Sequence, residues 1–182
     1  LGTHAFDMLN WFFGEAINVS GKLATSIKKR PLPNSSDLND VTSEDVCLAN
    51  IEISNYSSNL IPCQVSLSSI SKNGRGFSLE IYGSEGSLIL KSENQKDYVH
   101  GFNLKYSNNE NKIQNLTADS SFNFEKTWTD GRIAPVLRIQ NLWAQSVMNG
   151  TPVIPGLCEG LASHKVCEAI RESSKSGLSI KI

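Results

Sequence analysis

The first fifteen residues combine large apolar side chains with helix-boundary signals at both ends. Gly2-Thr3 is typical of a turn and cap, because a threonine side chain accepts a hydrogen bond from a free N–H of the first helical turn. Gly14 is typical of a helix end. The pattern predicts a helix that carries His4 and Asp7, three residues apart, on one face. Apolar residues fill most of its other positions: Phe6, Met8, Leu9, Trp11, Phe12 and Phe13.

After this helix, apolar and polar positions alternate in a way that predicts an antiparallel sheet with one buried and one polar face. The clearest unit is a hairpin in which Gly83-Ser84-Glu85-Gly86 joins strands 77–82 and 87–91. The charged and proline-containing segment 28–43 is expected to be a long loop. The remaining strands are expected at 17–27, 45–54, 62–71, 97–107, 112–117 and 122–128.

The spacing of apolar residues changes from a strand-like to a helical period near the end of the chain. Apolar residues recur at helical spacing from Pro135 to Asn149-Gly150, and an extended linker follows at 151–155. A second helix is predicted over 157–175, ended by Gly177, with a last strand at 178–182. Its expected buried residues are Cys158, Leu161, Ala162, Val166, Ala169 and Ile170. One helix, many strands, two helices and one strand predict an α+β fold: an open, predominantly antiparallel sheet with helices on one face.

Composition narrows the class of protein. A length of 182 residues favours one domain over 1–182, and a net charge of −1 gives no electrostatic reason to expect binding to nucleic acid or to an anionic membrane. No apolar stretch is long enough to span a bilayer. The four cysteines contain no C-x-x-C pair, which favours reduced thiols in a cytoplasmic protein over a disulfide.

Few residues are candidates for chemistry. His4 is the first, because an imidazole titrates near neutral pH; the alternative is a structural bond at a helix N-terminus. Asp7 is either a site residue or an ordinary first-turn acid favoured by the helix dipole. Arg132 follows Trp128 and Asp130 in a loop before a helix, where it either binds a substrate oxygen or is a surface side chain.

Other motifs point away from metal and nucleotide sites. His100 and His164 have no partners at metal-ligand spacing, and no third ligand completes a site with His4 and Asp7. Gly74-Arg75-Gly76 is expected to be a turn, since no strand–glycine loop–helix pattern surrounds it. No metal or cofactor-binding residue is therefore assigned within this chain.

The motif Gly2-x-His4-x-x-Asp7, followed by an apolar run and Gly14, resembles the second domain of the glucose–fructose oxidoreductase and inositol dehydrogenase family (Gfo/Idh/MocA). The family pattern has a leading Asp that would precede Leu1, so this chain is expected to be part of a longer protein. The Gly83–Gly86 hairpin and Glu159-Gly160 near the last helix also resemble the family, so the likeness extends over the whole chain in order.

The resemblance implies a substrate-binding and oligomerisation domain whose N-terminal Rossmann domain, which binds most of the NAD or NADP, lies outside this chain. His4 is then the catalytic acid/base at a hydroxyl of a sugar, cyclitol or related polyol, and Asp7 orients His4 or binds substrate. The resemblance further implies a homodimer or homotetramer through the sheet face, and a fragment that is inactive alone. The alternatives are a non-catalytic binding or assembly module with the same fold and, less favoured, a metal-assisted hydrolase.

Overall fold

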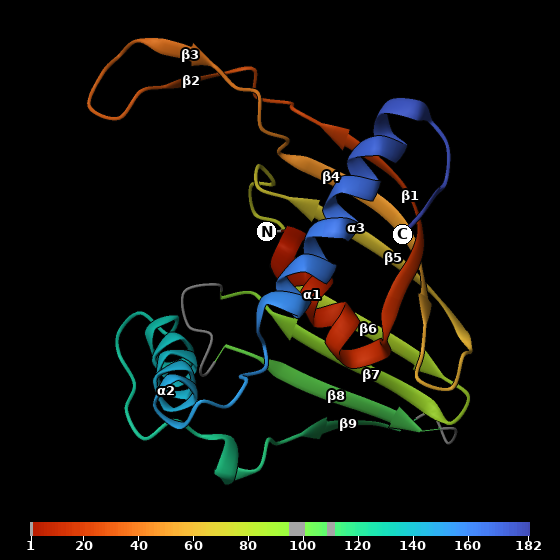
Figure 1. Ribbon diagram of the computed structural model, residues 1–182, viewed down its shortest axis with the longest axis vertical. Helices are drawn as coiled ribbons and strands as arrows, with labels where there is room; N and C mark the ends of the chain where they lie inside the picture. The colour runs from red at the N-terminus through yellow and green to blue at the C-terminus, as the bar shows by residue number, and fades with distance from the viewer. Residues whose placement is uncertain (1, 95–100, 109–111) are drawn as a thin grey trace. The chain divides into compact units, whose positions relative to one another are not determined.

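The computed structural model describes residues 2–94, 101–108 and 112–182 (Figure 1). Its internal contacts divide the chain into two compact units. Unit 1 comprises residues 1–71 and 154–182, and unit 2 comprises residues 72–153. That the chain forms a single substrate-binding and oligomerisation domain stays a prediction.

Unit 1 is built on a four-stranded antiparallel sheet in the order β10-β1-β4-β5. These strands are β1 (Glu15–Ala24), β4 (Val46–Ser54), β5 (Leu60–Ser68) and β10 (Ile180–Lys181). Two helices, α1 (Gly2–Phe13) and α3 (Leu157–Ser176), pack against each other and on this sheet (Figure 1). The buried core on that face consists of Val19, Ala49, Ile51, Ile53 and Val65. Gly2 and Thr3 lie within α1, so the predicted turn before the helix is wrong by two residues.

The helix α3 is held close to β1 by a glycine and a buried serine. A Cβ atom on Gly21 would lie 2.9 Å from Cγ2 of Ile170, so the glycine permits this close approach. Ser173 Oγ accepts a hydrogen bond from the Gly21 amide at 3.0 Å and donates one to the Leu178 carbonyl at 2.6 Å. Ser173 thereby ties α3 both to the sheet and to the chain that leads into β10.

The predicted burial along α3 is only partly right. Val166, Ala169 and Ile170 are buried, whereas Cys158 and Leu161 are exposed, with 59% of Leu161 accessible. Successive helical residues are about 100° apart around the axis, which places Leu161 well away from the stripe through Val166 and Ala169. All four cysteines are free, and burial raises the pKa of the Cys47, Cys63 and Cys167 thiols.

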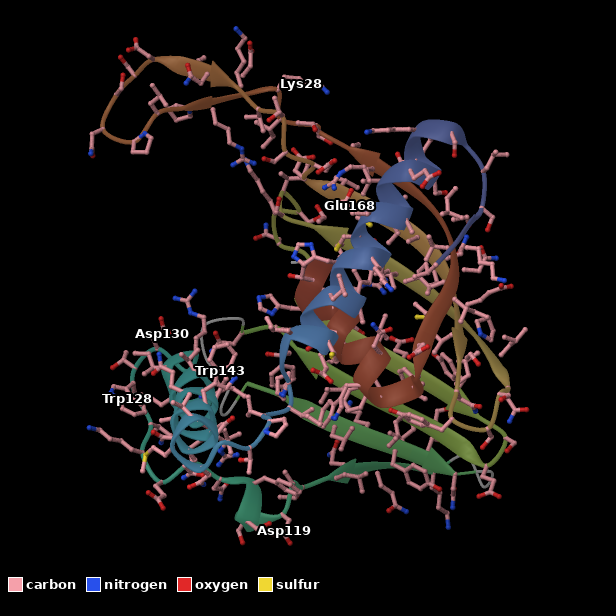
Figure 2. The ribbon with its side chains drawn as sticks, in the orientation of Figure 1. Lys28, Asp119, Trp128, Asp130, Trp143 and Glu168 are labelled. Carbon is pink, nitrogen blue, oxygen red and sulfur yellow. The ribbon has the colours of Figure 1, made fainter. Side chains whose placement is uncertain are left out.

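Segment 28–43, expected to be a loop, contains a hairpin of β2 (Lys29–Pro31) and β3 (Leu38–Asp40). Its base is fixed by the buried Asp45, whose carboxylate accepts hydrogen bonds from the Ser26 amide at 2.7 Å and the Ile27 amide at 2.9 Å. These two amides hold the Asp45 pKa below its ordinary value. The hairpin extends from the sheet, with Lys28 at its base (Figures 1 and 2). The loop prediction failed because this anchor lies outside segment 28–43, whose own charges and prolines are those of a loop.

Unit 2 contains a second antiparallel sheet in the order β6-β7-β8-β9. Its strands are β6 (Phe77–Gly83), β7 (Gly86–Ser92), β8 (Asn103–Asn108) and β9 (Ile113–Leu116). The predicted hairpin is confirmed, with Gly83 paired to Gly86. Residues 97–100 of one predicted strand lie outside the described residues.

The predicted strand at 122–128 is wrong. A short 3-10 helix, η1 (Ser120–Phe122), is capped by Asp119, which accepts from the Ser121 amide at 2.8 Å, and it leads into an irregular segment. Phe124 belongs to that segment, and Cζ of Arg138, in the helix that follows, lies 4.2 Å from its ring centroid. The helix α2 (Ile133–Asn149) follows, as predicted, and ends at Gly150. Side-chain contacts with α2 thus replace the strand pairing that the alternation suggested.

The α+β class with open antiparallel sheets and three α-helices is confirmed in the part of the chain that the structure describes. None of the described helices has the length and apolar character needed to cross a membrane.

Candidate functional site

The helix α1 has one face fixed in unit 1. Phe6 and Leu9 are 3% and 5% exposed, so they form the side of the helix that packs inward. Gly2 brings the first turn close to α3, because a Cβ there would lie 3.2 Å from Cε2 of Phe6 and 3.7 Å from Sγ of Cys167. The glycine of the sequence motif therefore has a packing role.

The C-terminal end of α1 is fixed equally firmly. Gly14 has a φ of 114°, and its amide donates to the Asn10 carbonyl at 3.0 Å. A Cβ on Gly14 would lie 2.3 Å from the Ser54 carbonyl oxygen, so a side chain there is incompatible with this turn. The Asn10 side chain accepts a hydrogen bond from the Ala16 amide at 3.3 Å. Asn10 is therefore part of the helix end.

His4 and Asp7 lie on the other side of α1. His4 is exposed and Asp7 is half-buried. Within residues 2–94, 101–108 and 112–182, neither side chain makes a hydrogen bond or an ion pair, and none joins the two. An imidazole and a carboxylate one helical turn apart, on a rigid helix and without protein partners, are available to a ligand. This pair is the arrangement predicted from the sequence.

Arg132 belongs to unit 2, immediately before α2. Its guanidinium binds Asp130 through two nitrogens, with Nε 2.9 Å from Oδ1 and Nη2 2.6 Å from Oδ2. The Arg132 amide also donates to Oδ1 at 3.0 Å. These contacts lower the Asp130 pKa to about 2. Figure 2 labels Asp130 and Trp128 in this segment, and Lys126 lies 5.0 Å from the Trp128 ring. A substrate oxygen can accept hydrogen bonds from these two Arg132 nitrogens only if it replaces the Asp130 carboxylate as their partner.

Trp11 is the residue that the sequence reasoning did not consider for the site. An apolar residue in this run is expected to pack inward, yet 72% of the Trp11 surface is exposed. Its indole stacks on Phe12, with ring centroids 4.9 Å apart and planes inclined by 28°. The available signal was its spacing of seven residues from His4, which places both on one face.

The described residues do not form a dinucleotide-binding cradle or a metal centre. Gly76 directly precedes β6 in the turn after β5, so no helix N-terminus follows the Gly74-Arg75-Gly76 glycines. No group of three potential metal ligands occurs in the described parts of the chain. His164 is exposed on α3, and His100 lies outside the described residues.

Solved structures support this fold. The chain matches an NAD-binding oxidoreductase from Klebsiella pneumoniae with a TM-score of 0.74 at 20% identity, over 100% of this chain and 49% of that one. It matches levoglucosan dehydrogenase in complex with NADH and levoglucosan with a TM-score of 0.72 at 17% identity, over 100% of this chain and 49% of that one. At these identities the likeness shows the fold alone.

Sequence comparison identifies the family. An uncharacterized oxidoreductase of Synechocystis sp. is 37% identical over 174 residues, which are 95% of this chain and 46% of that protein. The chain thus spans about half the length of the relatives it matches. The family model described as "Oxidoreductase family, C-terminal alpha/beta domain" matches residues 1–182. The chain therefore belongs to the Gfo/Idh/MocA oxidoreductase family, as its C-terminal domain.

Proposed function

We propose that this chain is the substrate-binding and oligomerisation domain of an NAD(P)-dependent dehydrogenase acting on a sugar, a cyclitol or a related polyol. The observation that carries the proposal is the pair of an exposed His4 and a half-buried Asp7 on α1, neither of which has a partner among the described residues. The family relationship supports an oxidoreductase as the parent protein. The structural neighbour that binds levoglucosan and NADH supports a carbohydrate-like substrate and a nicotinamide cofactor.

In this proposal, His4 holds or releases the proton of the substrate hydroxyl at an imidazole nitrogen. Proton transfer by a positioned side chain contributes about 10²- to 10⁴-fold to a rate. Asp7, one turn further along α1, orients the imidazole or accepts a hydrogen bond from a second hydroxyl. Arg132 donates to a substrate oxygen once that oxygen has replaced the Asp130 carboxylate as its partner. NAD or NADP is bound mainly by the part of the parent outside this chain, since the described residues contain no cradle for it.

The proposed oligomer is a homodimer or homotetramer that uses the open face of the unit 1 sheet. That face is opposite the one that α1 and α3 cover, and it carries polar side chains from neighbouring strands. Among them, Asn18 donates to Glu52 at 3.0 Å. A shallow hollow of about 510 Å³ lies here, lined in part by Ser20, Asn50 and Gln64.

Free thiols are consistent with the cytoplasmic location that we propose.

Two measurements test the proposal. The full-length parent, mixed with NAD⁺ or NADP⁺ and separately with glucose, myo-inositol or levoglucosan, is expected to produce the reduced cofactor, followed by its absorbance. The isolated 182-residue chain is expected to bind NADH weakly, by fluorescence titration, and to show no turnover. A parent that forms the oligomer but turns over no polyol would favour the non-catalytic assembly module, and tight NADH binding by the isolated chain would contradict the proposed division of roles.

A further inference from the structure

The exposed face of α1 contains an aromatic side chain in addition to His4 and Asp7. Residues at positions 4, 7 and 11 recur at helical spacing and share one face. Trp11 is 72% exposed on that face, while Phe6 and Leu9 form the opposite, buried side. The exposure of Trp11 is therefore unrelated to the packing of α1 in unit 1.

Helix geometry places the indole near Asp7. Side chains in an α-helix point back toward the N-terminus, so a residue covers the turn that precedes its own Cα. The turn preceding Trp11 is the one that carries Asp7. The axial rise from Asp7 to Trp11 is about 6 Å, which is comparable with the width of a six-membered sugar or cyclitol ring.

The indole is also supported from the side. Phe12 stacks on it with centroids 4.9 Å apart, and Phe12 in turn meets Phe13 edge-on at 5.9 Å. These contacts restrict the rotation of Trp11 and present a flat aromatic surface beside two hydrogen-bonding groups. Binding sites for small molecules combine such apolar surfaces with a few well-placed polar groups.

We infer that Trp11 is a substrate-positioning residue, whose indole packs on the C–H face of a polyol ring while Asp7 and His4 bind its hydroxyl groups. Sugars and cyclitols have a polar rim of hydroxyls and less polar ring faces formed by C–H bonds. A carboxylate and an imidazole suit the rim, and an indole suits a ring face. This inference rests on the proposed function, since it assumes that the parent acts on such a ring.

The test uses the full-length parent and the best substrate among glucose, myo-inositol and levoglucosan. Trp11→Ala is expected to raise KM for that polyol about three- to tenfold, the range for the loss of one aromatic contact. Both kcat and the Kd for NADH should change less than about twofold, because the contact exists equally in the ground state and the transition state. Trp11→Phe should restore most of the affinity, since it keeps an aromatic ring.

Tyr56→Ala is the matched control, because Tyr56 is an aromatic residue that is 86% exposed in the turn between β4 and β5. Its KM should equal that of the wild type. An unchanged KM in Trp11→Ala would overturn the inference, and so would a lower melting temperature without a KM effect, which would place Trp11 in a packing contact. If the wild-type parent turns over none of the polyols, the proposed function fails first, and the inference fails with it.

Discussion

Replacing Ser173 with alanine tests whether the contact between α3 and β1 determines the stability of unit 1. Ser173 is 2% exposed, and its hydroxyl satisfies both the Gly21 amide and the Leu178 carbonyl. The substitution removes both bonds and leaves the Gly21 donor without a partner. A net hydrogen bond contributes about 1 kcal/mol, and an unsatisfied buried donor costs about 1–3 kcal/mol. Because Leu178 is well exposed, water can replace its bond. We therefore expect a loss of about 2 kcal/mol in the free energy of unfolding.

The assay is urea denaturation of the chain, followed by circular dichroism. With a denaturant slope of about 2 kcal/mol per molar, the midpoint should fall by about 1 M. Ser176→Ala is the matched control, because Ser176 lies three residues further along α3, is exposed and accepts only from the Leu178 amide at 3.2 Å. Its effect should stay within about 0.5 kcal/mol. Equal midpoints for the two variants would refute the reasoning.

Three further predictions concern the site, acid stability and packing. His4→Gln in the parent should lower kcat about 10²- to 10⁴-fold without changing the melting temperature, because His4 is exposed. At pH values above the ordinary aspartate pKa, Asp45→Asn should have a lower melting temperature than the wild type. This difference between the two proteins should vanish as the pH falls through the depressed pKa of Asp45 in the folded state. Gly21→Ala should cost about 1–3 kcal/mol in urea denaturation, since its Cβ would meet Ile170, whereas Gly160→Ala, with open space around it, should not destabilise.

Each of these predictions can be contradicted. Retention of normal kcat by His4→Gln would remove its assigned role as acid/base. A constant stability difference between wild type and Asp45→Asn from neutral to strongly acidic pH would show that the bonded carboxylate is not the source of the effect. Equal stabilities of the Gly21 and Gly160 variants would show that α3 moves away from β1 without cost.

The parts of the fold predicted correctly are those encoded by local patterns. The helix at α1 and its end at Gly14 follow from apolar residues and a glycine within fifteen positions. The Gly83–Gly86 hairpin likewise depends on neighbouring residues. The β2–β3 hairpin was missed because its base is held by Asp45, and segment 28–43 itself has the charges and prolines of a loop. Alternation at 122–128 suggested a strand, but the structure has Phe124 beneath Arg138 of α2.

The geometry of the candidate site was predictable to a similar degree. The shared face of His4 and Asp7 follows from their spacing, and the structure adds that neither has a partner among the described residues. The pairing of Arg132 with Asp130 was not foreseen, although the two residues are only two positions apart, because spacing alone does not determine the direction of a side chain in a loop. The exposure of Trp11 was also hidden, since an apolar residue in an apolar helix is ordinarily assigned to the core.

The two sides of α1 have separate physical roles, and this separation makes the site testable. Phe6 and Leu9 determine where the helix lies, so changes there should lower stability before they alter chemistry. His4 and Trp11 are exposed on the other side, so changes there should alter turnover or affinity at constant stability. Gly2 lies on the packing side, two residues before His4, and a Cβ there would press on Phe6 and lie against Cys167 of α3. A side chain at Gly2 would therefore shift the imidazole by displacing the turn that carries it. The motif Gly-x-His-x-x-Asp thus combines a packing residue with the two polar groups that it positions.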